Sequence, residues 1–307
     1  MRNISVRKYT FQLSLAFLFL VAAILFSSVA KAQNLGYEGP TGIFVTPLAA
    51  TAASPANGFG KPVIATHVLA GGPAIGTFTT YSITEGYGKR AEFGYTREDH
   101  ATTDSKNAFS GLWSEGQNIF HGKINVLPEN YGKTKWVPAL SVGGIVRTND
   151  HYVFNNHAYN PGQANYNADV YLVGTKIVVV DKKLPVVLNG GVRGTNASLW
   201  GLGGNAPEWT PRAFGAVAFV LTGPKKSTVI LGSEVAQQPQ HVLSGSSSVL
   251  DIPTSIDYAI RVVPFAKQKL NIDAGVLQAA GRVGSPNLPG VDLQARARFA
   301  FGLSYGF

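Results

Sequence analysis

The chain has 307 residues, of which 14% are charged and 11% are aromatic, and its formal net charge is +9. Because a typical soluble domain carries about 25% charged residues, this composition is unusual for a soluble enzyme and too apolar for a disordered chain. The complete absence of cysteine excludes a disulfide framework, a thiolate metal site and a cysteine nucleophile.

Residues 1–32 have the features of a cleaved secretory signal peptide. Three cations among the first eight residues precede an apolar stretch at 11–26, and a small-x-small pattern ends at Ala32. This stretch is short for a membrane span, which needs about 20 residues. We therefore expect cleavage after Ala32, which removes four cations and lowers the formal charge to +5.

Residues 33–61 differ from the rest of the chain because they are rich in Gly, Pro and Ala. Their Pro and Gly density argues against a continuous membrane strand. If the strands that follow close into an outer-membrane barrel, as argued below, three arrangements of this segment remain open: a plug inside the barrel, a short strand at its periplasmic rim, or a free arm. A partial plug is the preferred interpretation.

From residue 62 onward, short segments alternate apolar and polar residues and are separated by turn residues, a pattern typical of an all-β protein. Alternating short turns with longer loops gives about twelve strands, within a range of 10–14, and both termini on the periplasmic side. The expected strands are 62–69, 75–83, 89–97, 118–126, 136–147, 169–180, 184–194, 213–222, 227–237, 255–264, 268–279 and 293–307.

The C-terminal segment favours an outer-membrane barrel over a secreted β-sandwich. Its alternate positions are aromatic or apolar as far as the last residue, and this ending resembles the terminal assembly signal of bacterial outer-membrane proteins. The positions are Phe299, Phe301, Leu303, Tyr305 and Phe307. We therefore predict an all-β, transmembrane antiparallel barrel over 62–307, in the outer membrane of a Gram-negative bacterium. Its partners would be membrane lipids and the assembly machinery.

The charged residues of the strands should face the lumen, because a charge on the lipid face near the bilayer midplane costs about 2–4 kcal/mol. On 169–180 this reasoning places Tyr171 and Val173 outward and Lys176 inward. With Glu92, the expected lumen set has eight basic residues and four acids. The candidates for contact with a solute are Arg90, Lys123, Arg147, Lys176, Arg193, Glu234, Asp257, Arg261, Asp273, Arg296 and Arg298.

The basic excess has two interpretations. A lining of one sign predicts a channel for small, possibly anionic solutes, because low-dielectric walls focus its field. Alternatively, the charges of the last three strands neutralise each other and close a narrow barrel, which would then serve as a structural or interaction protein for the envelope or for exopolysaccharide export.

Three segments of the chain resemble an uncharacterised bacterial family known only as a domain of unknown function. They are 121–140, 168–176 and 198–204. The resemblance covers most of the mature chain and implies a secreted outer-membrane barrel, without a substrate or a catalytic residue. The Gly-Pro-Thr-Gly element near the N-terminus is also loosely similar to exopolysaccharide-associated barrel lipoproteins, although the lipobox cysteine is absent.

No motif predicts an enzyme. None of the six histidines lies in a hydrolase motif, and the glycine-rich runs lack the strand-to-helix setting of a phosphate loop. Histidines and acids in the long loops are better explained as solvated residues than as a metal site. We therefore expect no catalytic residue, metal, cofactor or nucleic-acid partner.

Overall fold

A computed structural model describes most of the chain beyond the expected signal peptide. The described residues are 34–71, 76–101, 116–149, 166–180, 184–201, 205–239, 241–242, 249–264, 269–285, 288–292 and 297–307. The expected signal peptide, residues 1–32, and the candidate Arg296 lie outside these ranges. No helix in these ranges is long and apolar enough to cross a membrane.

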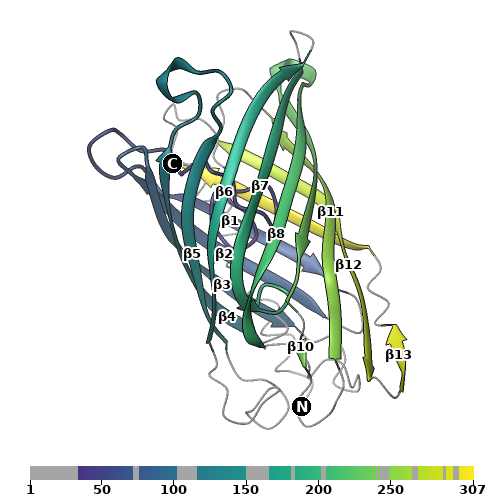
Figure 1. The fold of residues 1–307 in the computed structure, drawn as a ribbon. Helices are drawn as coiled ribbons and strands as arrows, with labels where there is room; N and C mark the ends of the chain where they lie inside the picture. Colours follow the sequence, from purple (N-terminus) through teal and green to yellow (C-terminus); the bar gives the residue numbers. More distant parts are fainter. Residues whose placement is uncertain are drawn as a thin grey trace, which may run out of the picture.

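The described strands form one antiparallel sheet that closes on itself as a barrel of twelve strands (Figure 1). Closure occurs where β1 pairs with β14, and β10 and β13 are short additions that pair with β11 and β12. The strands are β1 (Val63–Ala70), β2 (Thr77–Tyr87), β3 (Ala91–Ala101), β4 (Gly116–Leu127), β5 (Ala139–Asn149), β6 (Tyr166–Val180), β7 (Leu184–Ala197), β8 (Asn205–Thr222), β9 (Thr228–Gln237), β10 (His241–Val242), β11 (Val249–Val263), β12 (Leu270–Ser285), β13 (Leu288–Asp292) and β14 (Arg298–Gly306).

The predicted strand count is confirmed, since each of the twelve expected segments overlaps one barrel strand. Short turns join β2 to β3, β4 to β5 and β8 to β9, and the turns after β4 and β8 contain the 3-10 helices Tyr131–Lys133 and Pro224–Lys226. These turns share one end of the barrel, called here the short-turn end.

The outer face of the barrel is an apolar belt. Along β14 the outward residues, from Phe299 to Tyr305, alternate with inward residues that are small or polar. Other exposed apolar side chains of the belt include Phe93, Phe120, Ile124, Val142, Val170, Leu172, Leu188, Leu231, Tyr258 and Val276. The period of two therefore separates an apolar outside from a polar inside, as in membrane barrels.

The predicted faces of β6 are wrong by one residue. Tyr171 and Val173 are buried in the lumen, while Val170 and Leu172 are exposed outside. Both sets are apolar, so the alternation on this strand does not reveal which set faces lipid. Asp169 shows which set of β6 side chains faces the lumen, because its carboxylate is buried and binds Arg147. A shift of one residue would exchange every side chain of the strand between the two faces.

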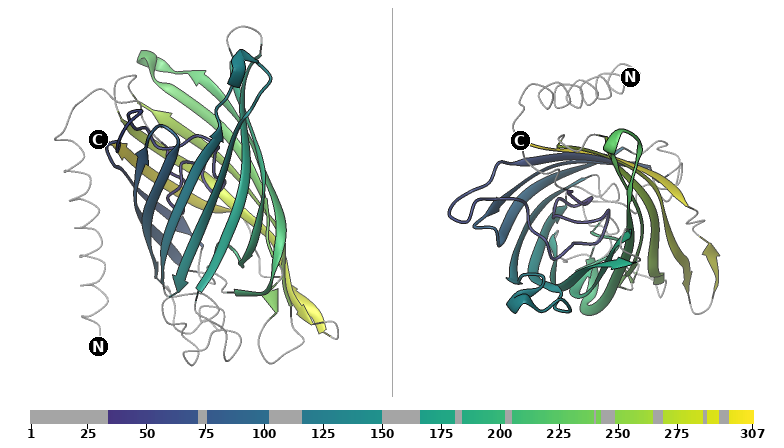
Figure 2. Two further views of the ribbon diagram at one scale, coloured as in Figure 1. Left: turned by 60° about the vertical axis from the view of Figure 1, so that its left-hand side comes forward. Right: turned by 90° about the horizontal axis from the view of Figure 1, so that it is seen from above.

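Residues 34–52 lie inside the ring of strands, where Figure 2 shows them in purple, and are called the plug. The plug folds back on itself, with bridges that pair Leu35 with Thr41 and Gly42 with Pro47. At Gly39, φ is 102° and an added Cβ would lie 2.4 Å from Oγ1 of Thr96. Only glycine combines this backbone conformation with so close an approach to the wall.

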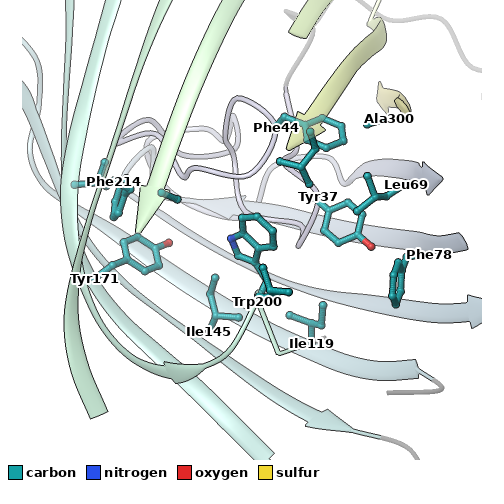
Figure 3. Packing of buried hydrophobic residues seen from close by; sticks show 14 of the residues in the cluster. Tyr37, Phe44, Leu69, Phe78, Ile119, Ile145, Tyr171, Trp200, Phe214 and Ala300 are labelled. Carbon is teal, nitrogen blue, oxygen red and sulfur yellow. The ribbon is translucent and has the colours of Figure 1, made fainter. Parts of the chain in front are cut away.

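The middle of the lumen contains an apolar core (Figure 3). Tyr37 and Phe44 of the plug pack with inward side chains of the wall and with Trp200, which follows β7. The wall residues include Leu69, Phe78, Ile119, Ile145, Tyr171 and Phe214. In the part of the chain that the structure describes, side chains therefore fill the middle of the barrel.

Candidate functional site: the charged lumen and its plug

Most of the predicted lumen residues lie on the inner face of the barrel and are buried. They are Lys123, Arg147, Arg193, Glu234, Asp257, Arg261 and Asp273. Arg298 is half-buried on the inner face of β14, directly opposite Leu277 of β12. The barrel thus brings residues from seven different strands into one interior.

Two of the predicted lumen residues lie elsewhere. Arg90 is exposed in the turn between β2 and β3, because the strand begins only at Ala91. Lys176 lies on the outer face of β6, opposite the exposed Leu188, and its ammonium group binds Glu129 at 2.9 Å. The shifted faces of β6 explain the second error.

Glu234 of β9 holds the central turn of the plug. Its carboxylate accepts hydrogen bonds from the backbone N–H groups of Phe44 at 2.5 Å and Thr46 at 2.6 Å, with a longer one from Val45 at 3.2 Å. The hydroxyl of Thr46 donates a further bond of 2.5 Å. Three successive backbone N–H groups form a concave site that suits an anion, and here the anion belongs to the wall.

Glu92 and Lys123, a buried ion pair of 2.9 Å on β3 and β4, hold the flanks of the plug. Glu92 accepts from the N–H and hydroxyl of Thr41 and from the N–H of Ala52. Lys123 donates to the carbonyl oxygens of Thr41 and Leu48, at 3.0 and 2.7 Å. Both charged groups therefore bind plug backbone as well as each other.

Arg261 and Asp273 form a second anchor on β11 and β12. The guanidinium group binds the Asp273 carboxylate through two bonds of 2.6 and 2.9 Å. Arg261 also donates to the carbonyl oxygens of Gly42 and Ile43, at 3.3 and 2.6 Å. The planar guanidinium fork permits both sets of bonds at once.

A third group of charges contains one residue of the plug, Glu38. Arg147 binds Glu38 at 2.5 Å and Asp169 at 2.7 Å, and the Arg193 guanidinium lies 3.6 Å from Asp169. Two cations and two carboxylates therefore neutralise each other in the interior. Burial, strengthened by the adjacent carboxylates of Glu98 and Glu38, raises the pKa of Tyr37 well above its usual range, so the phenol stays neutral.

The sequence reasoning missed three buried carboxylates, Glu38, Glu98 and Asp169. Glu98 lies just beyond the expected strand 89–97, and Asp169 is not among the expected lumen residues. Among the described residues, five buried cations face seven buried carboxylates. The cations are Lys123, Arg147, Arg193, Arg261 and Lys269, and the carboxylates are Glu38, Glu92, Glu98, Asp169, Glu234, Asp257 and Asp273. The described part of the interior therefore has no excess of buried cations, in contrast to the predicted lumen set.

The segment after β7 enters the barrel from the long-loop end. Leu199, Trp200 and Gly201 have successive positive φ values of 47°, 55° and 83°, which turn the chain inward. Leu199 and Trp200 are buried, and the carbonyl oxygen of Trp200 accepts a bond from Gln117 at 3.1 Å. An added Cβ at Gly201 would lie 2.7 Å from Cδ of Arg147, so the turn rests directly on the charged interior.

The space left between plug and wall is small. Two cavities, one lined by Arg193 and Asp169 and the other by Arg261 and Asp273, have volumes of about 10 Å³ each. Such a volume holds one water molecule at most. Within the described ranges, there is no group of three or more His, Asp or Glu side chains that could hold a metal ion.

His121 and His67 are buried inside the barrel. Nε2 of His121 is 3.1 Å from the hydroxyl of Thr84, while the His67 ring packs edge-on against Phe44. Both rings thus contribute to packing around the plug. The arrangement of the described charged residues binds the plug and balances its charge.

These features define a class of protein: a closed antiparallel barrel with an apolar belt and a lumen filled by its own N-terminal segment. The chain belongs to the family described as "Protein of unknown function (DUF3034)", which it matches over residues 35–273. This match confirms the resemblance to an uncharacterised family that the sequence indicated.

Two solved structures are similar to the chain. The COG4313 outer membrane channel from Pseudomonas putida F1 is 11% identical, with a TM-score of 0.43, over 83% of this chain and 97% of that one. The beta domain of the Bordetella autotransporter Brka is 12% identical, with a TM-score of 0.36, over 82% of this chain and 100% of that one. No curated protein matches the chain.

Proposed function

We propose that the protein is an outer-membrane barrel held closed by its plug, with a structural or interaction role in the envelope rather than that of an open anion channel. The short turns would face the periplasm and the long loops the exterior, as in other outer-membrane barrels. The C-terminal aromatic residues, on the outer face of β14, would serve as the assembly signal.

One observation carries this proposal: charged side chains of the wall are used to hold the plug. Lys123 and Arg261 bind plug carbonyl oxygens, and Arg147 binds the plug carboxylate of Glu38. A channel for anions needs cations that face an open path and remain available to the solute. Among the residues that the structure describes, the buried cations of the wall bind partners within the protein, and buried carboxylates outnumber the buried cations.

A second candidate function is a channel that opens when the plug leaves. It is favoured by the polar character of the contacts around Glu234 and Glu92, because water that entered the lumen could replace those hydrogen bonds. The apolar contacts of Tyr37 and Phe44 oppose this movement, since they would be lost without replacement.

Planar-bilayer recordings distinguish the closed barrel from the channel. We expect the intact mature protein to give no steady conductance and a variant that lacks residues 34–52 to give an open pore. Retention of the folded state by the variant is checked by its faster migration in unheated denaturing gels. Steady, anion-selective conductance of the intact protein would overturn the proposal. Brief openings that become frequent when the plug anchors are mutated would favour the second candidate.

A further inference from the structure

Four exposed cations lie on the outer surface in two neighbouring turns at the short-turn end. Lys89 and Arg90 are exposed in the turn between β2 and β3, and Lys133 and Lys135 are exposed in the turn between β4 and β5. These turns are neighbours, since the N–H of Asn125 near the end of β4 donates to the carbonyl of Arg90 at 2.6 Å.

Exposed aromatic rings accompany these four cations. Phe59 packs on Tyr87 with a ring separation of 4.9 Å and on Phe93 at 6.0 Å, and all three are about half exposed or more. In the next turn, Tyr131 is exposed, and Trp136 is 85% exposed. We call these five aromatic and four basic residues the basic rim.

Acidic residues near the basic rim do not balance it. Among the described residues, Glu129 is the acid of the turn between β4 and β5, and it is engaged by Lys176 at 2.9 Å. Glu85 of β2 is half-buried beside Phe93. The four cations therefore outnumber the acids at this edge of the barrel, and one of those acids is already paired.

We propose that the basic rim binds the anionic headgroups of phospholipids in the leaflet that surrounds the short-turn end. The rim continues the apolar belt, since Phe93 and Ile124 of β3 and β4 lie on the outer face next to these turns. Aromatic rings are favoured at the depth of the headgroups, and lysine or arginine beside them attracts anionic lipid. The proposal depends on membrane embedding and is independent of whether the lumen conducts.

Quenching of Trp136 fluorescence measures the lipid in contact with the rim. The experiment uses the mature protein with Trp113→Phe and Trp209→Phe, in phosphatidylcholine vesicles that contain a small fraction of brominated phosphatidylglycerol or brominated phosphatidylcholine. Trp200 is buried in the lumen, so the quenching reports on Trp136. We expect a preference for phosphatidylglycerol of about fivefold per contacting cation at low salt. It should fall towards unity in 1 M salt, where the Debye length is about 3 Å.

Both brominated lipids should quench Trp136 equally in a variant with four substitutions, Lys89→Gln, Arg90→Gln, Lys133→Gln and Lys135→Gln. Arg97→Gln is the matched control, because Arg97 lies on the outer face of β3 towards the other end, and it should keep the preference. Equal quenching of the starting protein by both lipids, or a preference that survives the four substitutions, would overturn the proposal. Absence of quenching by either lipid would instead refute the membrane embedding itself.

Discussion

Glu234→Gln tests whether the wall holds the plug through its backbone. The carboxylate accepts bonds from three N–H groups and one hydroxyl of the plug, whereas an amide oxygen can accept about two and the amide N–H₂ opposes the remaining donors. Hydrogen bonds to charged groups contribute about 1.5–3 kcal/mol each, so the gross loss is about 3–6 kcal/mol. Loss of repulsion from Asp257, directly opposite Glu234, offsets part of it. We expect a net loss of about 3 kcal/mol.

The chain offers a clean reporter for this prediction because it has no cysteine. Val45→Cys places a single thiol in the plug next to the Glu234 contacts, and its labelling rate by a water-soluble reagent reports how often the plug leaves. A loss of about 3 kcal/mol corresponds to a labelling rate roughly 100-fold higher in the Glu234→Gln background. Glu208→Gln, at an exposed position of β8, is the control and should leave the rate unchanged. A rate that stays within twofold in Glu234→Gln would refute the reasoning.

Three other substitutions test the interior and the belt. Asp257→Asn should raise the midpoint of thermal unfolding, because it removes a buried carboxylate that has no hydrogen-bond donor among the described residues; a lower midpoint would contradict this. Leu172→Arg should cost about 2–4 kcal/mol in urea unfolding from vesicles, whereas a cost equal to that of Leu172→Ala would place this face of β6 away from lipid. Trp200→Ala should cost about 3–5 kcal/mol in thermal unfolding by the loss of core packing, and a cost below about 0.5 kcal/mol would contradict this.

The strand count could be predicted because each barrel strand separates polar from apolar residues and is bounded by turn residues. Strand β14 is the clearest example, with Phe299, Phe301 and Leu303 outward and Ala300, Gly302 and Ser304 inward. Strand β6 could not be oriented in this way, since Val170 and Leu172 alternate with the equally apolar Tyr171 and Val173. The missing information was the neighbourhood of Asp169, which exists only after β5, β6 and β7 come together.

The contacts of the plug could not be predicted from residue types. Side chains of the wall reach peptide groups, which every residue of the segment carries, so no pairing of charges is visible in the sequence. The ion pair between Glu38 and Arg147 is the exception, but its partners are separated by 109 residues. The lumen charge was misjudged for a related reason: Arg90 and Lys176 lie outside, while Glu98 and Asp169 lie inside.

The way in which the plug is held has a consequence for how its sequence can vary. Because Lys123, Arg261 and Glu234 bind peptide groups, the geometry that they require is encoded mainly by the wall, and the side chains of Ile43 and Val45 can change without the loss of a hydrogen bond. Proline at 43 or 45 is the exception, since it removes an N–H group that donates to the carbonyl oxygen of Thr46 or to the carboxylate of Glu234. Related chains can therefore diverge at these two positions and keep the same hydrogen bonds, provided that the three wall residues persist.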